Sequence, residues 1–452
     1  MILFDIAATE IFSNKQALIF DLLGETKVNK LSEQVEVANG GLVERRKFLK
    51  SGATFLSVLA ASSASSAAQT DVFDDHPKHM KIPGVASELY GEPSKYESHV
   101  KRLPEHVYGS SIITAAFTPI DQLNGIITPA GLHFVVHHNG IPDIEPSDHE
   151  FKIHGLVHKP LKWSVESLLN YPMVSRVHFL ECAGNSGPNV IADAPMDMTC
   201  GQIHGQISGS LWTGVPLKYL LDEVGIKPNG KWAMCEGADS GNHVRNIPLQ
   251  KLYDDAIIAL YQNGERIRPD QGYPMRLFVP GYEGNMNVKW LHRMEISDIP
   301  SQSKDEQSLY ADITADERVK QYSFNMEVKS VITKPSGKQQ LPMSGFYEIS
   351  GFAWSGRGKV QKVEVSADGG KTWALAHLEG PIMSKSLTRF TIPWRWNGQK
   401  AIILSRAMDE YGNTQPTRQE WVSRYARYSH GHNNSINAWL VSNNGRVSNF
   451  YV

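Results

Sequence analysis

Residues 176–189 read Arg-Val-His-Phe-Leu-Glu-Cys-Ala-Gly-Asn-Ser-Gly-Pro-Asn, a segment in which a strand pattern runs into a cysteine and a loop of small residues. Val177, Phe179 and Glu181 alternate as residues on one face of a β-strand do, and Cys182 then leaves the strand. Small loop residues let the backbone pass close to a bulky ligand, and a thiolate is a soft ligand for a redox-active metal. Because a lone cysteine is more often a small buried hydrophobic residue, the segment alone leaves both interpretations open.

The composition is that of an ordinary folded protein with many turns. The chain has 452 residues, 45 basic and 47 acidic side chains and a formal charge of −2, which excludes bulk electrostatic binding of nucleic acid. Cys182, Cys200 and Cys235 are too few for a disulfide-stabilised scaffold, and the absence of a C-x-x-C-H motif predicts no covalent haem in this chain. The 37 glycines and 24 prolines favour a β-rich fold.

An export signal is predicted near the N-terminus. Arg45 and Arg46 precede Lys-Phe-Leu-Lys, and a weakly apolar run from Ser51 to Ala61 leads into a Ser/Ala tract that ends at Ala68. This order is typical of a twin-arginine signal peptide, so we expect export to the periplasm. The run is too short and too polar to cross about 30 Å of hydrocarbon, so we expect no membrane span. The alternative is a basic amphipathic helix on the folded domain.

Patterning along the chain predicts a β-rich α+β fold. The expected segments are an N-terminal extension with the signal peptide (1–68), an extended arm (69–104), a first domain (105–318), a second domain (319–430) and a C-terminal tail (431–452). Residues 1–43 precede the signal and are excluded from the expected fold. Helical spacing predicts helices over 163–170 and 216–224. Beyond the charged stretch 301–319, about seven short strands and an Asp-Gly-Gly turn at 368–370 predict an immunoglobulin-like β-sandwich.

Several separate motifs carry a resemblance to a known family. Cys182-Ala-Gly-Asn closely resembles the signature of the sulfite oxidase family of molybdenum enzymes. Further segments resemble that family in the same order: Gly-Gln-Ile-Ser-Gly-Ser-Leu-Trp-Thr-Gly-Val-Pro-Leu at 205–217, Glu-Gly-Ala-Asp at 236–239, Gly-Tyr-Pro-Met-Arg-Leu-Phe-Val-Pro-Gly at 272–281, Asn-Val-Lys-Trp-Leu at 287–291 and Val-Glu-Val-Ser-Ala-Asp-Gly-Gly-Lys-Thr-Trp at 363–373. The resemblance spans about residues 105–430 and implies a molybdopterin-binding oxidoreductase domain followed by a dimerisation sandwich.

The resemblance implies a cofactor site. Cys182 would be the ligand of a molybdenum-oxo centre that is also held by a molybdopterin. The implied cofactor-binding set is His137, Asn139, Cys182, Asp239, Arg276, Asn287, Val288 and Lys289. Arg and Lys are natural partners for the pterin phosphate, although a surface salt bridge is the alternative for Arg276 and Lys289.

The implied catalytic set adds histidines and a tyrosine to Cys182. His137 and His138 are candidates, with a hydrogen-bonded loop pair as the alternative for both. The substrate-side tyrosine of the family is assigned to Tyr322, with Tyr310 as the second candidate. Either tyrosine could instead be an ordinary aromatic residue at the domain interface.

Departures from the family pattern bear on the substrate. Sulfite-oxidising members carry an arginine where this chain has His137, two arginines where it has Ser186 and Gly187, and a histidine where it has Gln271. A pocket without those guanidinium groups should bind a small sulfur dianion poorly. The pattern and the tail, which includes Tyr-Ser-His-Gly-His-Asn-Asn at 428–434, resemble the molybdenum subunit of sulfane dehydrogenase in the bacterial Sox thiosulfate-oxidising system.

That subfamily resemblance implies a substrate and partners. The substrate would be sulfane sulfur on a carrier protein, the electron acceptor a c-type cytochrome subunit, and the assembly a homodimer within a hetero-oligomer. The alternatives are a sulfite dehydrogenase, a sulfoxide reductase of the same fold, and a cofactor-free binding subunit.

Overall fold

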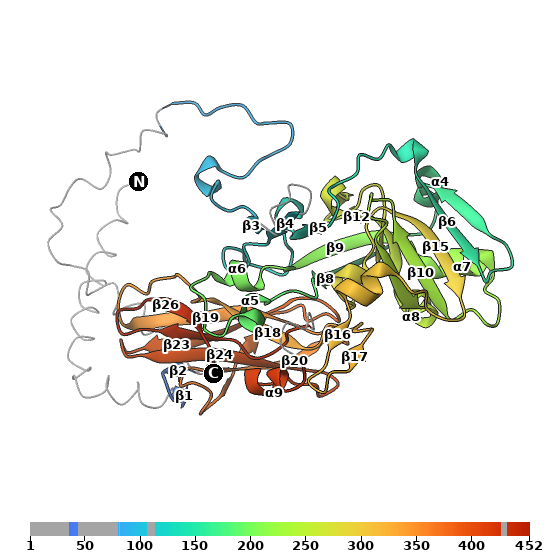
Figure 1. The fold of residues 1–452 in the computed structure, drawn as a ribbon. Helices are drawn as coiled ribbons and strands as arrows, with labels where there is room; N and C mark the ends of the chain where they lie inside the picture. The colour runs from blue at the N-terminus through green and yellow to red at the C-terminus, as the bar shows by residue number, and fades with distance from the viewer. Residues whose placement is uncertain (1–35, 44–79, 81, 106–113, 426–431) are drawn as a thin grey trace, which may run out of the picture.

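The computed structural model describes residues 36–43, 80, 82–105, 114–425 and 432–452, and it arranges them in two β-rich bodies with an arm at the N-terminal side (Figure 1). The predicted β-rich α+β class is confirmed. Arg45 and Arg46 of the predicted export signal lie outside the described residues. In the described part of the chain, no helix is long and apolar enough to cross a membrane.

The first body is built on three sheets. One is the sheet β11-β10-β15-β6-β7, in which β15 runs parallel to β6: β6 (Glu150–Gly155), β7 (Leu161–Ser164), β10 (Trp232–Gly237), β11 (Val244–Pro248) and β15 (Leu291–Ser297). The second is the sheet β13-β12-β9-β8 with β14 paired to β12: β8 (Val174–Glu181), β9 (Ile207–Pro216), β12 (Ile257–Gln262), β13 (Glu265–Arg266) and β14 (Arg276–Phe278). The third consists of β3 (Leu103–Glu105), β4 (Thr114–Phe117) and β5 (Val135–His137).

Short helices connect these strands. They are α4 (Val165–Leu169), α5 (Pro188–Ile191), α6 (Cys200–His204), α7 (Leu217–Val224), α8 (Leu249–Asp254), the 3-10 turns η2 (Lys95–Glu97), η3 (Ala130–Leu132), η4 (Pro146–Asp148), η5 (Pro269–Gln271) and η6 (Gly284–Met286), and the π-helical turn η7 (Asp305–Leu309). Both predicted helices are present. The Ser164 hydroxyl caps α4 by accepting from the Ser167 N–H at 3.1 Å, and Gly225 ends α7 with a φ of +63°, which glycine adopts without strain.

The second body is a β-sandwich. Its first sheet contains β1 (Glu36–Ala38), β2 (Leu42–Val43), β18 (Lys329–Lys334), β19 (Gly345–Trp354), β22 (His377–Leu378) and β23 (Thr388–Trp396). Its second sheet contains β20 (Val360–Ser366), β21 (Ala374–Leu375), β24 (Ala401–Asp409), β25 (Ala438–Val441) and β26 (Val447–Phe450). The strand pair β16 (Asp312–Ile313) and β17 (Val319–Lys320) and the helix α9 (Arg418–Val422) lie beside it. Gly369 and Gly370 have positive φ values, as the predicted turn requires.

Two expectations about the sandwich were wrong. Residues 36–43, which we excluded from the fold, form a hairpin whose Leu42 pairs with Trp394 and is fully buried. The segment 431–452, expected as a separate tail, supplies β25 and β26 to the second sheet. In both cases short apolar runs complete a sheet edge whose other strands are far away in sequence, so no local pattern indicates the pairing.

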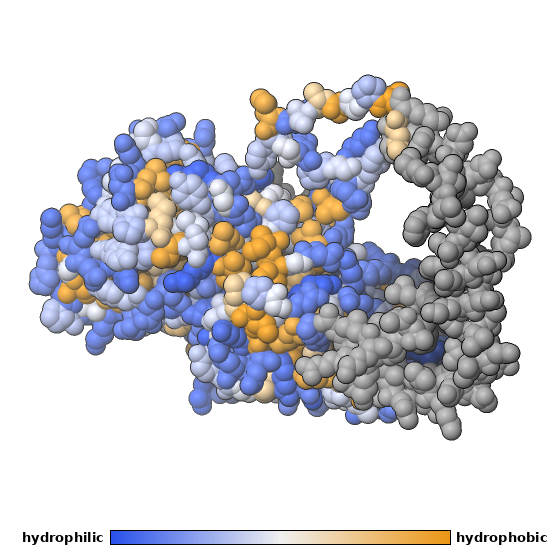
Figure 2. Space-filling view, turned by 180° about the vertical axis from the view of Figure 1, so that it is seen from behind, coloured by the Kyte–Doolittle hydropathy of each residue, from blue (hydrophilic) through white to orange (hydrophobic). Residues whose placement is uncertain are grey.

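The two bodies share part of one hydrophobic core. Phe179 of β8 packs against Trp354 of β19 with ring centroids 6.4 Å apart, and both side chains are buried. Figure 2 shows the opposite face, where apolar side chains gather toward the middle of the molecule and the outer parts are mostly hydrophilic. The end of β8, where Cys182 follows, therefore lies close to the sandwich.

Candidate active site

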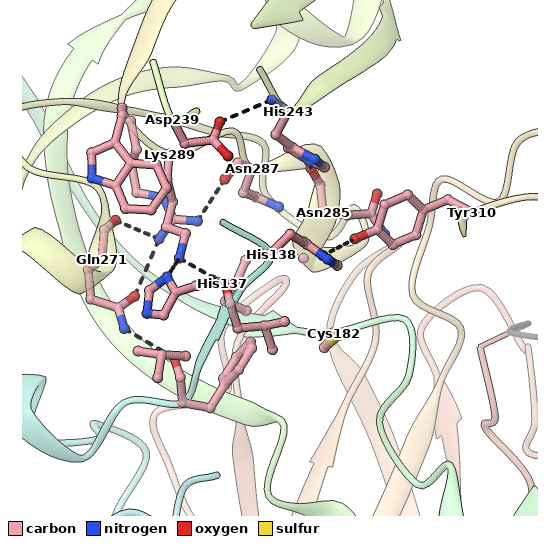
Figure 3. Close-up of a pocket in the computed structure, with 17 residues that line it drawn as sticks. His137, His138, Cys182, Asp239, His243, Gln271, Asn285, Asn287, Lys289 and Tyr310 are labelled. Carbon is pink, nitrogen blue, oxygen red and sulfur yellow. Dashed lines mark hydrogen bonds between the residues drawn. The ribbon is translucent and has the colours of Figure 1, made fainter. Parts of the chain in front are cut away.

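A cavity opens in the first body beside the end of β8. Its volume is about 710 Å³, counted with the open space at its mouth. Predicted site residues that line it are His137, His138, Cys182, Asp239, Arg276, Asn287 and Lys289. Figure 3 shows His138 and Tyr310 on one side of it, His137, Lys289 and Gln271 on the other, and Cys182 lower in the view. Segments distant in sequence therefore converge on one cavity.

Cys182 is held by its backbone at the start of the loop after β8. Its N–H donates to the Gln206 carbonyl at 3.0 Å, and its own carbonyl accepts from the Asn185 N–H at 3.0 Å. Gly284 of η6 comes so close that a Cβ there would lie 3.2 Å from the Cys182 Cα. Cys182 is partly exposed, whereas Cys200 and Cys235 are fully buried, so the cysteine of the motif is the one that faces the cavity.

Arg276 is a buried cation on the cavity wall. Its guanidinium donates to the carbonyls of Gln271 at 3.0 Å and Asn287 at 2.8 Å, and it lies 5.2 Å from the Trp212 ring. Burial lowers the pKa of Arg276 to about 9. The Nε atom is buried without a hydrogen-bond partner among the described residues. This donor remains available to a ligand.

Lys289 is a second cation on the same cavity. Its ammonium donates to the carbonyls of Val136 at 3.0 Å and Asp270 at 3.2 Å, and it lies 2.8 Å from Nδ1 of His137. Burial, and then the charge of Arg276, lower the pKa of Lys289 to about 7. The alternative of a surface salt bridge does not describe either cation.

The two cations test whether an anionic cofactor fits. In the part of the chain that the structure describes, neither Arg276 nor Lys289 forms an ion pair with a carboxylate. Buried charges in proteins are normally paired, so a cavity with two such cations favours an anionic ligand. A thiol, an unsatisfied guanidinium N–H and these cations on one cavity fit a pterin phosphate with a thiolate-bound metal.

Asp239 lies in the loop after β10 and lines the cavity. Its Oδ1 accepts from the His243 N–H at 3.0 Å, and its Oδ2 lies 3.5 Å from Nδ2 of Asn139. Asn139 itself is exposed and does not line the cavity, so it contacts the site through Asp239. Val288 is buried beside the cavity and does not line it either.

The structure places Tyr310, and not Tyr322, at the cavity. Tyr310 follows η7, and its Oη lies 3.1 Å from Nε2 of His138. Burial, and then the proximity of Cys182, raise the pKa of Tyr310, while burial lowers the pKa of His138. Tyr322 instead stacks on Phe324, with centroids 5.3 Å apart, and packs at a tilt against Trp232, with centroids 5.4 Å apart. The substrate-side role of Tyr322 therefore stays a prediction, while the structure brings Tyr310, the second candidate, to the cavity.

Several cavity residues were missed from the sequence, among them His243, Asn285 and Trp290. His243 stacks on His138 and lies 3.4 Å from a carboxylate oxygen of Asp305. Its Nε2 donates to the backbone carbonyl of Asn285 at 2.9 Å. Trp290 also lines the cavity. The sequence marked these residues only by their positions relative to the motifs. Asn285 lies between two motifs, His243 follows Asp239 by four residues, and Trp290 lies within a motif.

Comparisons with known proteins identify both domains. Residues 138–305 match the family model of the oxidoreductase molybdopterin binding domain, and residues 320–438 match that of the Mo-co oxidoreductase dimerisation domain. The fold and site thus define a molybdenum-dependent oxidoreductase with a dimerisation domain.

Solved and curated relatives narrow the class. The crystal structure of the sulfane dehydrogenase SoxCD from Paracoccus pantotrophus is similar over 85% of this chain and 100% of that chain, with 39% identity and a TM-score of 0.82. NADH nitrate reductases from Solanum lycopersicum and Arabidopsis thaliana are each 32% identical over 67% and 68% of this chain. The chain spans 38% of the length of these curated relatives. It belongs to the sulfite oxidase family.

Proposed function

We propose that this protein is the molybdenum subunit of a periplasmic sulfane dehydrogenase, which oxidises sulfane sulfur bound to a carrier protein during thiosulfate oxidation. One observation supports the proposal that the protein binds the cofactor. Cys182 lines the same cavity as Arg276 and Lys289, two cations without carboxylate partners among the described residues. When bound, a molybdenum-molybdopterin cofactor supplies two-electron oxygen transfer at sulfur.

Each residue then has a physical role. Cys182 is the metal ligand, because a thiolate is a soft donor. Arg276 and Lys289 bind the phosphate, and Asp239 with the backbone near Asn287 and Val288 binds the edges of the pterin ring. His137 contributes a neutral ring at the pterin side, and Asn139 holds Asp239. His138 and Tyr310 form a hydrogen-bonded pair that can hold or pass a proton on the substrate side.

The substrate proposal rests on which charges surround the cavity. Arg276 and Lys289 are the arginine and lysine among the described lining residues. Arg276 donates to the carbonyl of Gln271, which lies on the same side of the cavity as Lys289 (Figure 3). The side near Tyr310 presents His138, His243 and Asn285 instead. Sulfite carries one to two negative charges near neutral pH. The guanidinium of Arg245, 4.6 Å from the Tyr310 ring, does not line the cavity and is paired with Glu306, so this wall favours a substrate held by its protein carrier. The similarity to a sulfane dehydrogenase supports the same choice.

The proposal includes the export route and the partner proteins. The Arg45-Arg46 signal supports export by the twin-arginine route. Electrons pass to a c-type cytochrome subunit, as the resemblance of the sequence to the sulfane dehydrogenase subfamily implies. The match to a dimerisation domain supports a homodimer within a hetero-oligomer.

Steady-state assays test the substrate. The purified protein with its cytochrome is given either free sulfite or carrier protein loaded with thiosulfate-derived sulfane sulfur, and reduction of cytochrome is followed. We expect rapid turnover with the loaded carrier and slow turnover with sulfite. Fast turnover of free sulfite, with no turnover of the loaded carrier, would favour the alternative of a sulfite dehydrogenase. Reduction of a sulfoxide with electrons from a reduced dye would favour the alternative of a sulfoxide reductase. Metal analysis separates the third alternative, since a cofactor-free binding subunit would carry no molybdenum after expression in a competent host.

A further inference from the structure

A fully buried ion pair joins the two domains directly behind Cys182. Glu181, the last residue of β8, accepts from the ammonium of Lys329, the first residue of β18, at 3.0 Å. Both side chains are 0% exposed. Lys329 of the sandwich therefore places its positive charge on Glu181, the residue that precedes Cys182 in the chain.

The Glu181 carboxylate accepts hydrogen bonds from donors of both domains. Besides Lys329, its Oε1 accepts from Nδ2 of Asn185 at 2.9 Å. Its Oε2 accepts from Nε1 of Trp354, in β19 of the sandwich, at 2.6 Å. Three donors on one buried carboxylate hold it in a single orientation.

Lys329 also holds the far end of the cysteine loop. Its ammonium donates to the Ser186 hydroxyl at 2.8 Å, and this hydroxyl lies 2.7 Å from Nδ1 of His204. Ser186 has a φ of +69°, a left-handed conformation that a serine adopts under constraint from its surroundings. One ammonium thus binds a side chain immediately before Cys182 and another four residues after it.

The loop between these two points is tied to itself and to Gln206. Oδ1 of Asn185 accepts from the Gln206 N–H at 3.2 Å, and the Gln206 carbonyl accepts from the Cys182 N–H at 3.0 Å. Asn185 thereby connects the Glu181 carboxylate to Gln206, the residue before β9 whose carbonyl holds the Cys182 backbone. Removing the ammonium from Lys329 takes away one contact at each end of this frame at once.

A buried ion pair is weak support for stability alone, because desolvation offsets most of its attraction. We propose that Lys329, with Trp354, is a positioning residue that the sandwich supplies to the active site, where it fixes the direction of the Cys182 thiol toward the cavity. The sandwich then has a role in cofactor binding in addition to dimerisation. This inference rests on the proposed function of Cys182 as the cofactor ligand.

Four variants of the full chain test the inference. Lys329→Met removes the ammonium, and Trp354→Phe removes one donor while keeping most of the ring. Glu181→Gln/Lys329→Met removes both charges and avoids an uncompensated buried carboxylate. Lys359→Met removes an exposed sandwich lysine and serves as the matched control.

The readouts are molybdenum per chain, the electron paramagnetic resonance spectrum of the partly reduced protein, and the rate at which iodoacetamide labels Cys182 in protein from a cofactor-deficient host. For residues that orient a metal ligand, loss of affinity or activity is typically about 10- to 100-fold, and we expect that range for Lys329→Met. The double variant should recover the thermal midpoint of the wild type but keep an altered spectrum and an altered labelling rate. Trp354→Phe should shift the spectrum and the labelling rate in the same direction but by less. Lys359→Met should change neither the spectrum nor the labelling rate.

The inference is overturned when the folded double variant and Trp354→Phe both keep the molybdenum content, spectrum and labelling rate of the wild type. These two variants decide the question even where Lys329→Met does not fold. The parent proposal fails separately. It fails when the wild-type protein contains no molybdenum, or when Cys182→Ser retains it. When the wild type contains the metal and Cys182→Ser does not, unchanged Lys329 and Trp354 variants refute the positioning role alone.

Discussion

Nζ of Lys289 lies 2.8 Å from Nδ1 of His137, and both residues line the cavity. An ammonium can only donate, so Nδ1 accepts and the imidazole proton lies on Nε2. Burial, and then the charge of Lys289, lower the pKa of His137 to about 2, which keeps the ring neutral. Nε2 is buried without a partner among the described residues, so His137 offers a neutral N–H donor to a ligand.

The depressed pKa of Lys289 predicts a pH dependence of stability in cofactor-free protein. Its folded value is about 7 and its ordinary value 10.5, so between these values the unfolded chain binds more protons. This group therefore stabilises the folded state progressively as the pH rises through that window, and the contribution is lost as the pH falls toward 7. We expect the free energy of unfolding of the wild type to rise relative to Lys289→Met, by at most about 1.4 kcal/mol per pH unit. Denaturant titrations across the window measure this, and a constant difference contradicts it.

Cys182→Ser should abolish activity and molybdenum binding while leaving the fold intact. A serine hydroxyl is not ionised near neutral pH and is a poor ligand for a soft metal. Metal analysis and circular dichroism check both parts. Cys235→Ser is the control, since Cys235 is fully buried in β10 and away from the cavity lining. Turnover that survives in Cys182→Ser would refute the ligand assignment.

Arg276→Met should lower the molybdenum content by about tenfold or more, because a hydrogen bond to a charged group contributes about 1.5–3 kcal/mol. Arg293→Met is the matched control. Arg293 belongs to the same domain but pairs with Glu236 and does not line the cavity. Metal content measured after identical purification compares the two. Equal loss in both variants would indicate general destabilisation rather than loss of an anion site.

Tyr310→Phe should lower kcat by about 100-fold, because it removes the hydroxyl that lies against His138 and faces the cavity. Tyr322→Phe should leave kcat nearly unchanged, since that ring stacks in an aromatic cluster outside the cavity lining. Kinetics of both variants with the loaded carrier distinguish the two tyrosines. A large loss in Tyr322→Phe and none in Tyr310→Phe would support the assignment made from the sequence.

Removal of residues 1–68, which cleavage of the proposed signal peptide would also remove, should destabilise the sandwich by about 1–3 kcal/mol. The apolar gain from Leu42 and Val43 is partly offset by the cost of ordering the hairpin. Leu42 and Val43 are buried, and Nε1 of Trp394 donates to the Gly40 carbonyl at 2.6 Å. Denaturant unfolding of the shortened and full-length chains gives the difference. Leu42→Ala in the full-length chain should reproduce much of the loss. Equal stability of the two chains would show that the hairpin adds nothing.

Local chemistry accounts for what the sequence predicted well. Ser164 and Gly225 mark the ends of their helices through capping, and the glycines at 369 and 370 turn a hairpin because they adopt positive φ. The cysteine at 182 could be singled out because its strand and its small-residue loop are contiguous. Each of these signals acts within a few residues, which is the range over which backbone preference and periodicity are decisive.

The sequence by itself therefore determined the family, the β-rich class and the cysteine at the centre of the site. Tertiary structure alone decided that Tyr310 reaches the cavity while Tyr322 does not, that a hairpin at 36–43 completes the sandwich, and that Lys329 lies behind Cys182. These relationships join residues from separate sheets and domains. They depend on which surfaces pack together over the whole chain, and no short-range preference records that choice.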